Sequence, residues 1–196
     1  MAADAYQYAI QQTKEAQIKY LINQANIRTS EIKGTSVQEF LQTLRDIKAD
    51  QKGYMLDNIE VSAYASPDGS MKVNTALAQK REQSSKKYVG ESLKKNNLET
   101  ELDTRYTAED WDGFQQLLQA SNVQDKDSIL RVLSMYQDPE EREKQIRNIS
   151  AGYDELAKEI LPELRRARLT IHYNLIGRSD DEIQEQLKTD ASKLSV

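Results

Sequence analysis

The sequence of 196 residues has no cysteine, one histidine, three prolines and, apart from tyrosine, few aromatic residues. Without cysteine the chain has no disulfide, no thiolate metal site and no cysteine nucleophile. The single histidine, His172, excludes a histidine-rich metal site and leaves one imidazole as a candidate general base. The lack of cysteine is equally compatible with the cytosol and with the periplasm.

Long apolar runs and an excess of basic charge are also missing. Uninterrupted apolar stretches are short, such as Ala63-Tyr64-Ala65, whereas a membrane-spanning helix needs roughly 18 residues. Lysine and arginine number 27 against 32 acidic residues, a net charge of −5, which argues against duplex nucleic acid as a partner. The first residues lack a basic region followed by an apolar run, so we expect no signal peptide here. The ending at Val196 indicates a piece of a longer protein.

Periodic apolar residues divide most of the chain into strands and helices. A capping box at residues 36–39 (Ser-Val-Gln-Glu) precedes apolar residues at helical spacing, and the alternation from Ile59 to Ala65 is typical of a strand with one buried face. The residues before position 17 have a frayed or helical character. We therefore expect strands at residues 17–23, 59–65, 98–105 and 168–176, and helices at residues 37–50, 71–94 and 179–189.

Residues 107–161 contain no strand pattern. Their apolar residues recur at helical spacing, and Asp138-Pro139 is a typical helix start because proline fits the first turn. We expect three or four short helices that pack onto the rest of the domain, because this insert has too few aromatic residues for a core of its own. Trp111 should be largely buried.

This order predicts an α/β (α+β) fold with the sequence β-α-β-α-β, a helical insert and a last strand. The two long helices connect strands that we expect to be neighbours, so right-handed crossovers place both helices on one face of a small mixed sheet. A single domain would span residues 1–196, with its core at about residues 17–106 and 162–177, the insert at 107–161 and a terminal helix at 179–189.

The turn at residues 66–70 (Ser-Pro-Asp-Gly-Ser) is the most informative stretch for function. It joins a strand to a helix, and the free N–H groups and positive dipole at the start of a helix suit a carboxylate. Asn74 and Arg81 lie two helical turns apart on one face, and arginine binds a carboxylate with two hydrogen bonds. Spacing alone also allows a structural interpretation, in which Asn74 bonds the turn and Arg81 pairs with a surface acid.

At this point the sequence resembles the OmpA-like peptidoglycan-binding domains. The motif Asn74-x-x-Leu77-Ala78-x-x-Arg81 is similar to the family's Asn-x-x-Leu-Ser-x-x-Arg signature, and residues 63, 64 and 69 match its Gly-Tyr-Thr-Asp-x-x-Gly segment in place. Residues 20–27 resemble the family's first strand and its exit, and the arginines at 165 and 166 resemble a pair before its last strand. The resemblance covers about residues 17–176 and is weakest across the insert.

The resemblance implies a non-catalytic module that anchors an outer-membrane protein to peptidoglycan by binding the diaminopimelate of a stem peptide. It also implies a periplasmic location at the outer membrane, and the Ser-Pro-Asp-Gly variant with its long insert resembles envelope proteins of Bacteroidetes. Neither a cofactor nor a metal is implied, and other envelope proteins are the alternative partners. The implied ligand-binding residues are Arg81, Asn74, Ser66, Asp68, Gly69, Ser70 and Arg166.

One departure from the family concerns the amine of the ligand. The family holds diaminopimelate with an aspartate in the turn and the helix arginine, but the aspartate position here is Ser66, which supplies no negative charge. Asp68 either takes that role or only forms the turn. The alternative function is therefore a structural or protein-interaction domain of the same fold that has lost peptidoglycan binding.

Three other features are explained without catalysis. His172 stands on the polar side of the last strand, with no serine nucleophile motif to accompany it. Residues 109–112 lack the alternating oxygen ligands of a calcium loop and fit an acidic first helical turn. The basic cluster at residues 165–168 either contacts glycan or a stem carboxylate, or pairs with the acidic insert. Because no acid/base pair stands in a shared motif, we expect no enzyme activity.

Overall fold

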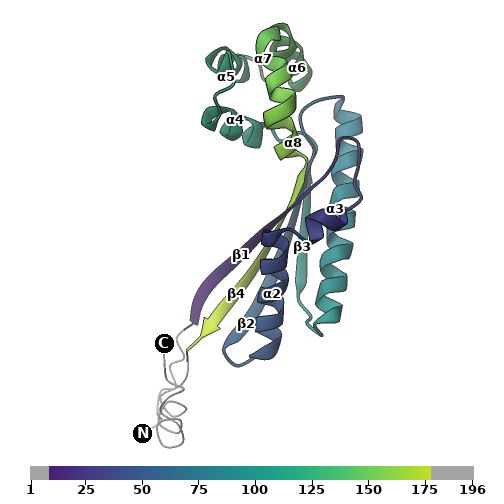
Figure 1. Cartoon of the computed structure of the whole chain (residues 1–196), viewed down its shortest axis with the longest axis vertical. Coiled ribbons are helices and arrows are strands. Elements are labelled where there is room, and N and C mark those ends of the chain that lie inside the picture. The colour runs from purple at the N-terminus through teal and green to yellow at the C-terminus, as the bar shows by residue number, and fades with distance from the viewer. Residues whose placement is uncertain (1–8, 178–196) are drawn as a thin grey trace, which may run out of the picture.

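The structure, a computed structural model, describes residues 9–177 and contains one four-stranded mixed sheet (Figure 1). The strand order is β1-β4-β2-β3, in which β4 runs antiparallel to both neighbours and β2 and β3 are parallel. The predicted α/β fold with a mixed sheet is thereby confirmed. The expectation that β1 and β2 are neighbours is wrong, because β4 lies between them. The strands are β1 (Ala9–Lys19), β2 (Tyr54–Tyr64), β3 (Glu101–Thr107) and β4 (Arg166–Ile176).

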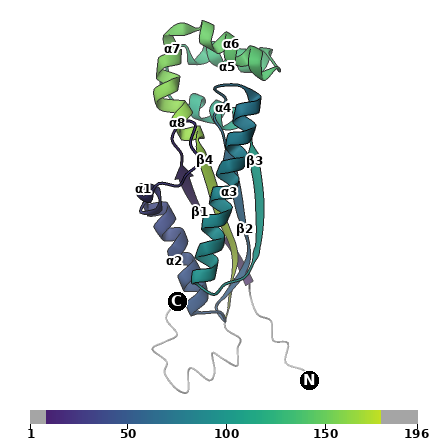
Figure 2. The same ribbon diagram turned by 90° about the vertical axis from the view of Figure 1, so that its right-hand side faces the viewer.

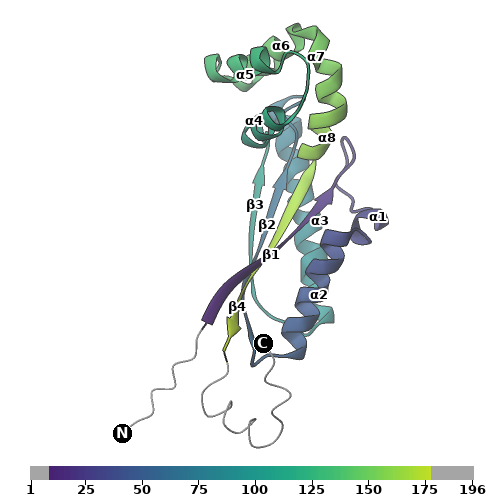
Figure 3. The ribbon, with the colours of Figure 1, turned by 60° about the vertical axis from the view of Figure 1, so that its left-hand side comes forward.

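Two long helices, α2 (Thr35–Ala49) and α3 (Met71–Lys95), cover the same face of the sheet, as predicted (Figures 2 and 3). A short helix, α1 (Thr29–Ile32), precedes them. The buried residues of α2 recur every three or four positions and form one core with alternate residues of β1, β2 and β4. The main core contains Val37, Phe40, Leu44, Ile47, Ile59, Val61, Val89, Leu169 and Ile171.

The start of α2 differs from the sequence prediction. Gly34 is its N-cap residue and makes no side-chain cap bond, so the predicted capping box at residues 36–39 is wrong. Ser36 instead accepts a hydrogen bond from the Gln17 N–H at 3.5 Å, and Glu39 pairs with Lys14 of β1. Both side chains therefore tie the helix to the first strand.

The first strand begins earlier than predicted. It spans Ala9–Lys19, and the residues after Tyr20 form a turn in which Asn23 has a φ of 56°, a conformation that asparagine tolerates. β1 pairs only with β4 and lies at the sheet edge, so most of its side chains are polar and exposed. Only Ala16 and Ile18 are buried, which leaves too weak an apolar alternation to mark the strand.

The insert lies at the end of the sheet where β4 begins (Figure 1). Its apolar residues form a second cluster, so the expectation that it lacks a core is wrong. Leucine, isoleucine and valine supply most of this core. Trp111 is only partly buried, less than the sequence predicted. Asp138 caps a helix that starts at Pro139, as predicted. The insert contains α4 (Trp111–Ala120), α5 (Lys126–Met135), α6 (Pro139–Asn148), α7 (Ser150–Glu155), a π-helical segment η1 (Leu156–Ile160) and α8 (Leu161–Leu164).

The sheet edge beside the insert positions the candidate site. The strands β1, β2 and β3 all end there, and β4 starts there. The predicted terminal helix at residues 179–189 lies outside the described residues. Within residues 9–177, no helix combines the length and the apolar character needed to cross a membrane.

Candidate functional site

The turn between β2 and α3 has the cap geometry that its sequence predicts. Ser70 is the N-cap residue of α3, and its hydroxyl accepts a hydrogen bond from the Val73 N–H at 3.5 Å. Gly69 has a φ of 108°, a conformation open mainly to glycine. The buried Asn74 donates to the Gly69 carbonyl and to the Glu109 carboxylate, each at 3.4 Å. Asn74 therefore fixes the turn, which is the structural role considered for it.

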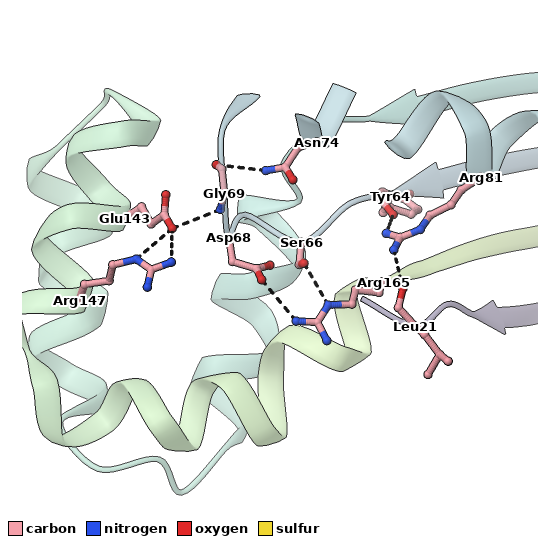
Figure 4. A network of polar contacts seen from close by, with 10 residues as sticks. All are labelled: Leu21, Tyr64, Ser66, Asp68, Gly69, Asn74, Arg81, Glu143, Arg147 and Arg165. Carbon is pink, nitrogen blue, oxygen red and sulfur yellow. Dashed lines mark hydrogen bonds and ion pairs between the residues drawn. The ribbon is translucent and has the colours of Figure 1, made fainter. Parts of the chain in front are cut away.

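Arg81 lies behind the turn, and its side chain has no exposed surface. Its guanidinium donates to the backbone carbonyl of Gln24 at 3.0 Å. It also donates to the carbonyls of Tyr64 at 2.9 Å and Leu21 at 3.2 Å (Figure 4). The group also lies over the Tyr20 ring, 5.2 Å from its centroid. Burial lowers the pKa of Arg81 to about 10, so the guanidinium remains charged at neutral pH.

These contacts give Arg81 a different position from the one expected. A ligand anchor needs a guanidinium that faces a cleft, whereas Arg81 joins the end of β2 to the loop after β1. Neither a ligand nor a surface acid is needed to satisfy it, because three carbonyl oxygens accept its hydrogen bonds. In the structure the residue acts as a clamp between two segments of the sheet edge.

Ser66 and Asp68 are both bound by Arg165, which lies between α8 and β4. Arg165 donates to the Ser66 hydroxyl at 3.3 Å and to the Asp68 carboxylate at 3.4 Å (Figure 4). The side chains of Arg165 and Asp68 are only 12% and 17% exposed, so the pair is largely shielded from solvent. The second oxygen of Asp68 is buried and has no hydrogen-bond partner.

The Gly69 amide is bound by a residue of the insert. Glu143 of α6 accepts its hydrogen bond at 3.2 Å, and Arg147 holds the same carboxylate oxygen at 2.6 Å (Figure 4). A carboxylate thus sits at the turn, as the dipole argument predicts, but the chain supplies it from its own sequence.

Arg166 points to a different partner. Its guanidinium donates to Asp110 at 3.0 Å and to the Glu163 carbonyl at 3.0 Å, and it lies 4.9 Å from the centroid of the Tyr64 ring. The turn is contacted by its neighbour Arg165 instead. The structure therefore brings Ser66, Asp68, Gly69, Ser70 and Asn74 together, and places Arg81 and Arg166 in supporting contacts around them.

A cleft lies between the first turns of α3 and the loop after β1. Its volume is about 790 Å³, and its lining contains two lysines and, among the residues that the structure describes, no acidic side chain. Val73, an exposed apolar residue, lines the cleft. Ile22, also exposed, directly precedes Asn23, which lines the opposite side. The lining residues are Asn23, Gln24, Ala25, Asn26, Lys72, Val73, Ala76, Leu77 and Lys80.

The sequence analysis did not predict four residues of this region. Lys72 and Lys80 line the cleft, and Glu143 and Arg165 contact the turn. The lysines belong to the same helix as the Asn…Arg motif, so their spacing of two turns was a usable signal. Glu143 gave no signal, because it is 74 residues from Gly69 and stands in an ordinary charged helix.

Comparison with known proteins gives limited information. No protein-family profile and no curated protein sequence matches the chain. Among solved structures, it is similar to the OmpA-like domain of FopA1 from Francisella tularensis subsp. tularensis SCHU S4. That similarity has a TM-score of 0.40 at 11% identity and covers 87% of this chain and 78% of the other. At this TM-score the match describes a likeness and decides neither family nor function.

The groups at this edge can bind charged ligands. Backbone N–H groups, arginines and lysines can hold carboxylates, and Asp68 can hold an amine. No group of three metal-ligating side chains is present among residues 9–177.

Proposed function

We propose that the chain is a non-catalytic binding module of the cell envelope that holds a carboxylate-bearing stem peptide of peptidoglycan. The ligand binds at the sheet edge beside the insert, in the cleft between α3 and the loop after β1, and reaches the turn at residues 66–70. The resemblance of the Asn74…Arg81 motif to the OmpA-like domains supports this ligand class. A parent protein at the outer membrane, with the module in the periplasm, is part of the same proposal.

The observation that carries the proposal is the charge of the cleft. Lys72 and Lys80 line it and no acidic side chain does, although the whole chain has a net charge of −5. The carboxyl ends of three strands meet at this edge, where open α/β sheets commonly bind their ligands. Arg81 fixes both Leu21 and Gln24 of the adjoining loop, so the motif residue shapes the cleft instead of contacting the ligand.

The test is a titration with a diaminopimelate-containing muropeptide, followed through the amide signals of residues 23–26 and 66–81. We expect shifts in both segments for the wild-type protein. The double variant Lys72→Ala/Lys80→Ala should bind about tenfold more weakly, because two charge contacts are lost. Lys94→Ala/Lys95→Ala is the matched control, since it removes the same charge from the last turn of α3.

A second candidate function is a structural or protein-interaction domain that has lost peptidoglycan binding. The internal pairing of Ser66, Asp68 and Gly69 with the insert favours it, because the family's ligand groups already have partners. Ser66→Asp separates the two candidates. If peptidoglycan is the ligand, the new carboxylate holds the ligand's amine and tightens binding about tenfold. If neither wild type nor Ser66→Asp shifts any amide, the interaction domain is the correct reading.

A further inference from the structure

Two charged side chains contact the turn at residues 66–70, one from α6 of the insert and one from the junction between the insert and β4. Glu143 accepts from the Gly69 amide, and Arg165 donates to Ser66 and to Asp68 (Figure 4). The contacted residues are three of the turn positions that the resemblance to the OmpA-like domains implies for ligand binding. Arg147 orients Glu143 through two hydrogen bonds of 3.0 and 2.6 Å, so the carboxylate is held at the turn from both sides.

The contact between turn and insert is incompletely packed. A pocket of about 20 Å³ separates Pro67 and Asp68 from apolar side chains of the insert, including Trp111 and Phe114. One buried oxygen of Asp68 has no hydrogen-bond partner in the structure. Side chains that line a pocket lose packing contacts, so the turn and the insert are held together less tightly than residues of a continuous core.

The insert also has the features of a unit that can move. Its buried apolar residues form a cluster of their own, separate from the sheet core. The connection to β4 passes through the π-helical segment η1 (Leu156–Ile160) and a proline at residue 162. π-helical segments interrupt the regular hydrogen-bond ladder and frequently occur at functional positions.

We infer that the insert is an autoinhibitory latch, in which Glu143 occupies the position of a ligand carboxylate at the Gly69 amide. The inference rests on the proposed function for the identity of the ligand. A stem-peptide carboxylate and Glu143 compete for the same N–H donor, and a ligand amine competes with Arg165 for Asp68. Binding at the turn therefore requires these contacts to open.

The experiment compares Glu143→Ala with Glu141→Ala, two variants that remove the same charge from the same helix. Glu141 bonds Gln145 and lies near Lys144, and it makes no contact with the turn. In Glu143→Ala the Gly69 amide signal should move upfield, and its hydrogen exchange should accelerate about tenfold, because the bond to a charged acceptor is lost. Affinity for the muropeptide should rise by a similar factor, whereas Glu141→Ala should change neither. Glu143→Leu, which also removes the acceptor and favours a helix, replaces the alanine variant if α6 does not fold.

The two measurements distinguish the latch from the proposed function. If neither the chemical shift nor the exchange rate of the Gly69 amide changes in Glu143→Ala, the latch is overturned, whether or not the muropeptide binds. A changed amide with no muropeptide binding in any variant supports the closed contact and removes the proposed function. A changed amide with equal affinity in wild type and variant overturns the competition, because the ligand then binds without displacing Glu143.

Discussion

Arg81 shows how a buried arginine can stabilise backbone that no regular element satisfies. The loop after β1 and the last residue of β2 present carbonyl groups at the sheet edge. The guanidinium, which has only donors, donates hydrogen bonds to three of these carbonyls. The Tyr20 ring packs over the guanidinium, and its hydroxyl is hydrogen-bonded to the Ser85 hydroxyl at 2.7 Å. The result is a cluster that holds two segments distant in sequence in one arrangement.

At the residue scale, Arg81→Ala should destabilise the fold instead of only removing a ligand contact. Three carbonyls lose a charged donor inside the protein, at a cost of about 3 kcal/mol or more in the free energy of unfolding. Arg81→Lys should lower the free energy of unfolding by nearly as much, because a single ammonium nitrogen cannot reach the three carbonyls that the three guanidinium nitrogens contact. Urea denaturation measures the change. Arg105→Ala is the control, since its side chain is 67% exposed, and an Arg81→Ala midpoint equal to that of wild type would contradict the clamp.

At the element scale, Asp110 connects the insert to the sheet. It is the N-cap residue of α4, accepts from the Gly113 N–H at 2.9 Å and pairs with Arg166 at the start of β4 at 3.0 Å. A Cβ atom at position 113 would collide with its carboxylate, so any other residue there would displace the carboxylate. One side chain thus caps a helix and fixes that helix to a strand 56 residues further along the chain.

Asp110→Ala should therefore cost about 3–5 kcal/mol of stability, because it leaves the nearly buried Arg166 unpaired and removes the cap. The side chains of the pair are 12% and 7% exposed, so solvent screens the interaction little. Asp112→Ala, two residues away and exposed in the first turn of the same helix, should change stability by no more than about 0.5 kcal/mol. Equal unfolding midpoints for the two variants would refute the role assigned to Asp110.

At the scale of the whole molecule, residues 9–177 contain two hydrophobic clusters. Polar contacts and the continuous run from α8 into β4 join them. Separate clusters allow one part to open while the other stays folded. The latch inferred above depends on this property, because the insert must move without unfolding the sheet.

Leu118→Ala and Leu169→Ala test this separation, since both remove the same fully buried side chain, one from each cluster. Each should cost about 3–5 kcal/mol locally. Hydrogen exchange followed by mass spectrometry should show Leu118→Ala accelerating exchange in α4 to α8 while the strands keep their protection. Leu169→Ala should accelerate exchange in the strands and in α2. Uniform acceleration across the chain in both variants would mean that the two clusters unfold together.

The sequence by itself determined the elements with strong local periodicity. The bounds of α3, the alternating strands β2 and β4, and the start of α6 at Asp138-Pro139 follow from residues that lie close together in the chain. The turn at residues 66–70 was also readable, because proline, glycine and a cap serine each impose a local backbone conformation.

Tertiary structure decided what depends on distant partners. The polar edge strand β1 is defined by its pairing with β4, and β4 takes its place between β1 and β2 only when the whole sheet assembles. Arg81 has the same helical spacing whether it faces solvent or carbonyls, and its partners Gln24 and Leu21 lie 57 and 60 residues away. The carboxylate at the Gly69 amide is 74 residues away. Periodicity reports which face of an element is buried, but the long-range contacts of the folded chain select which groups meet there.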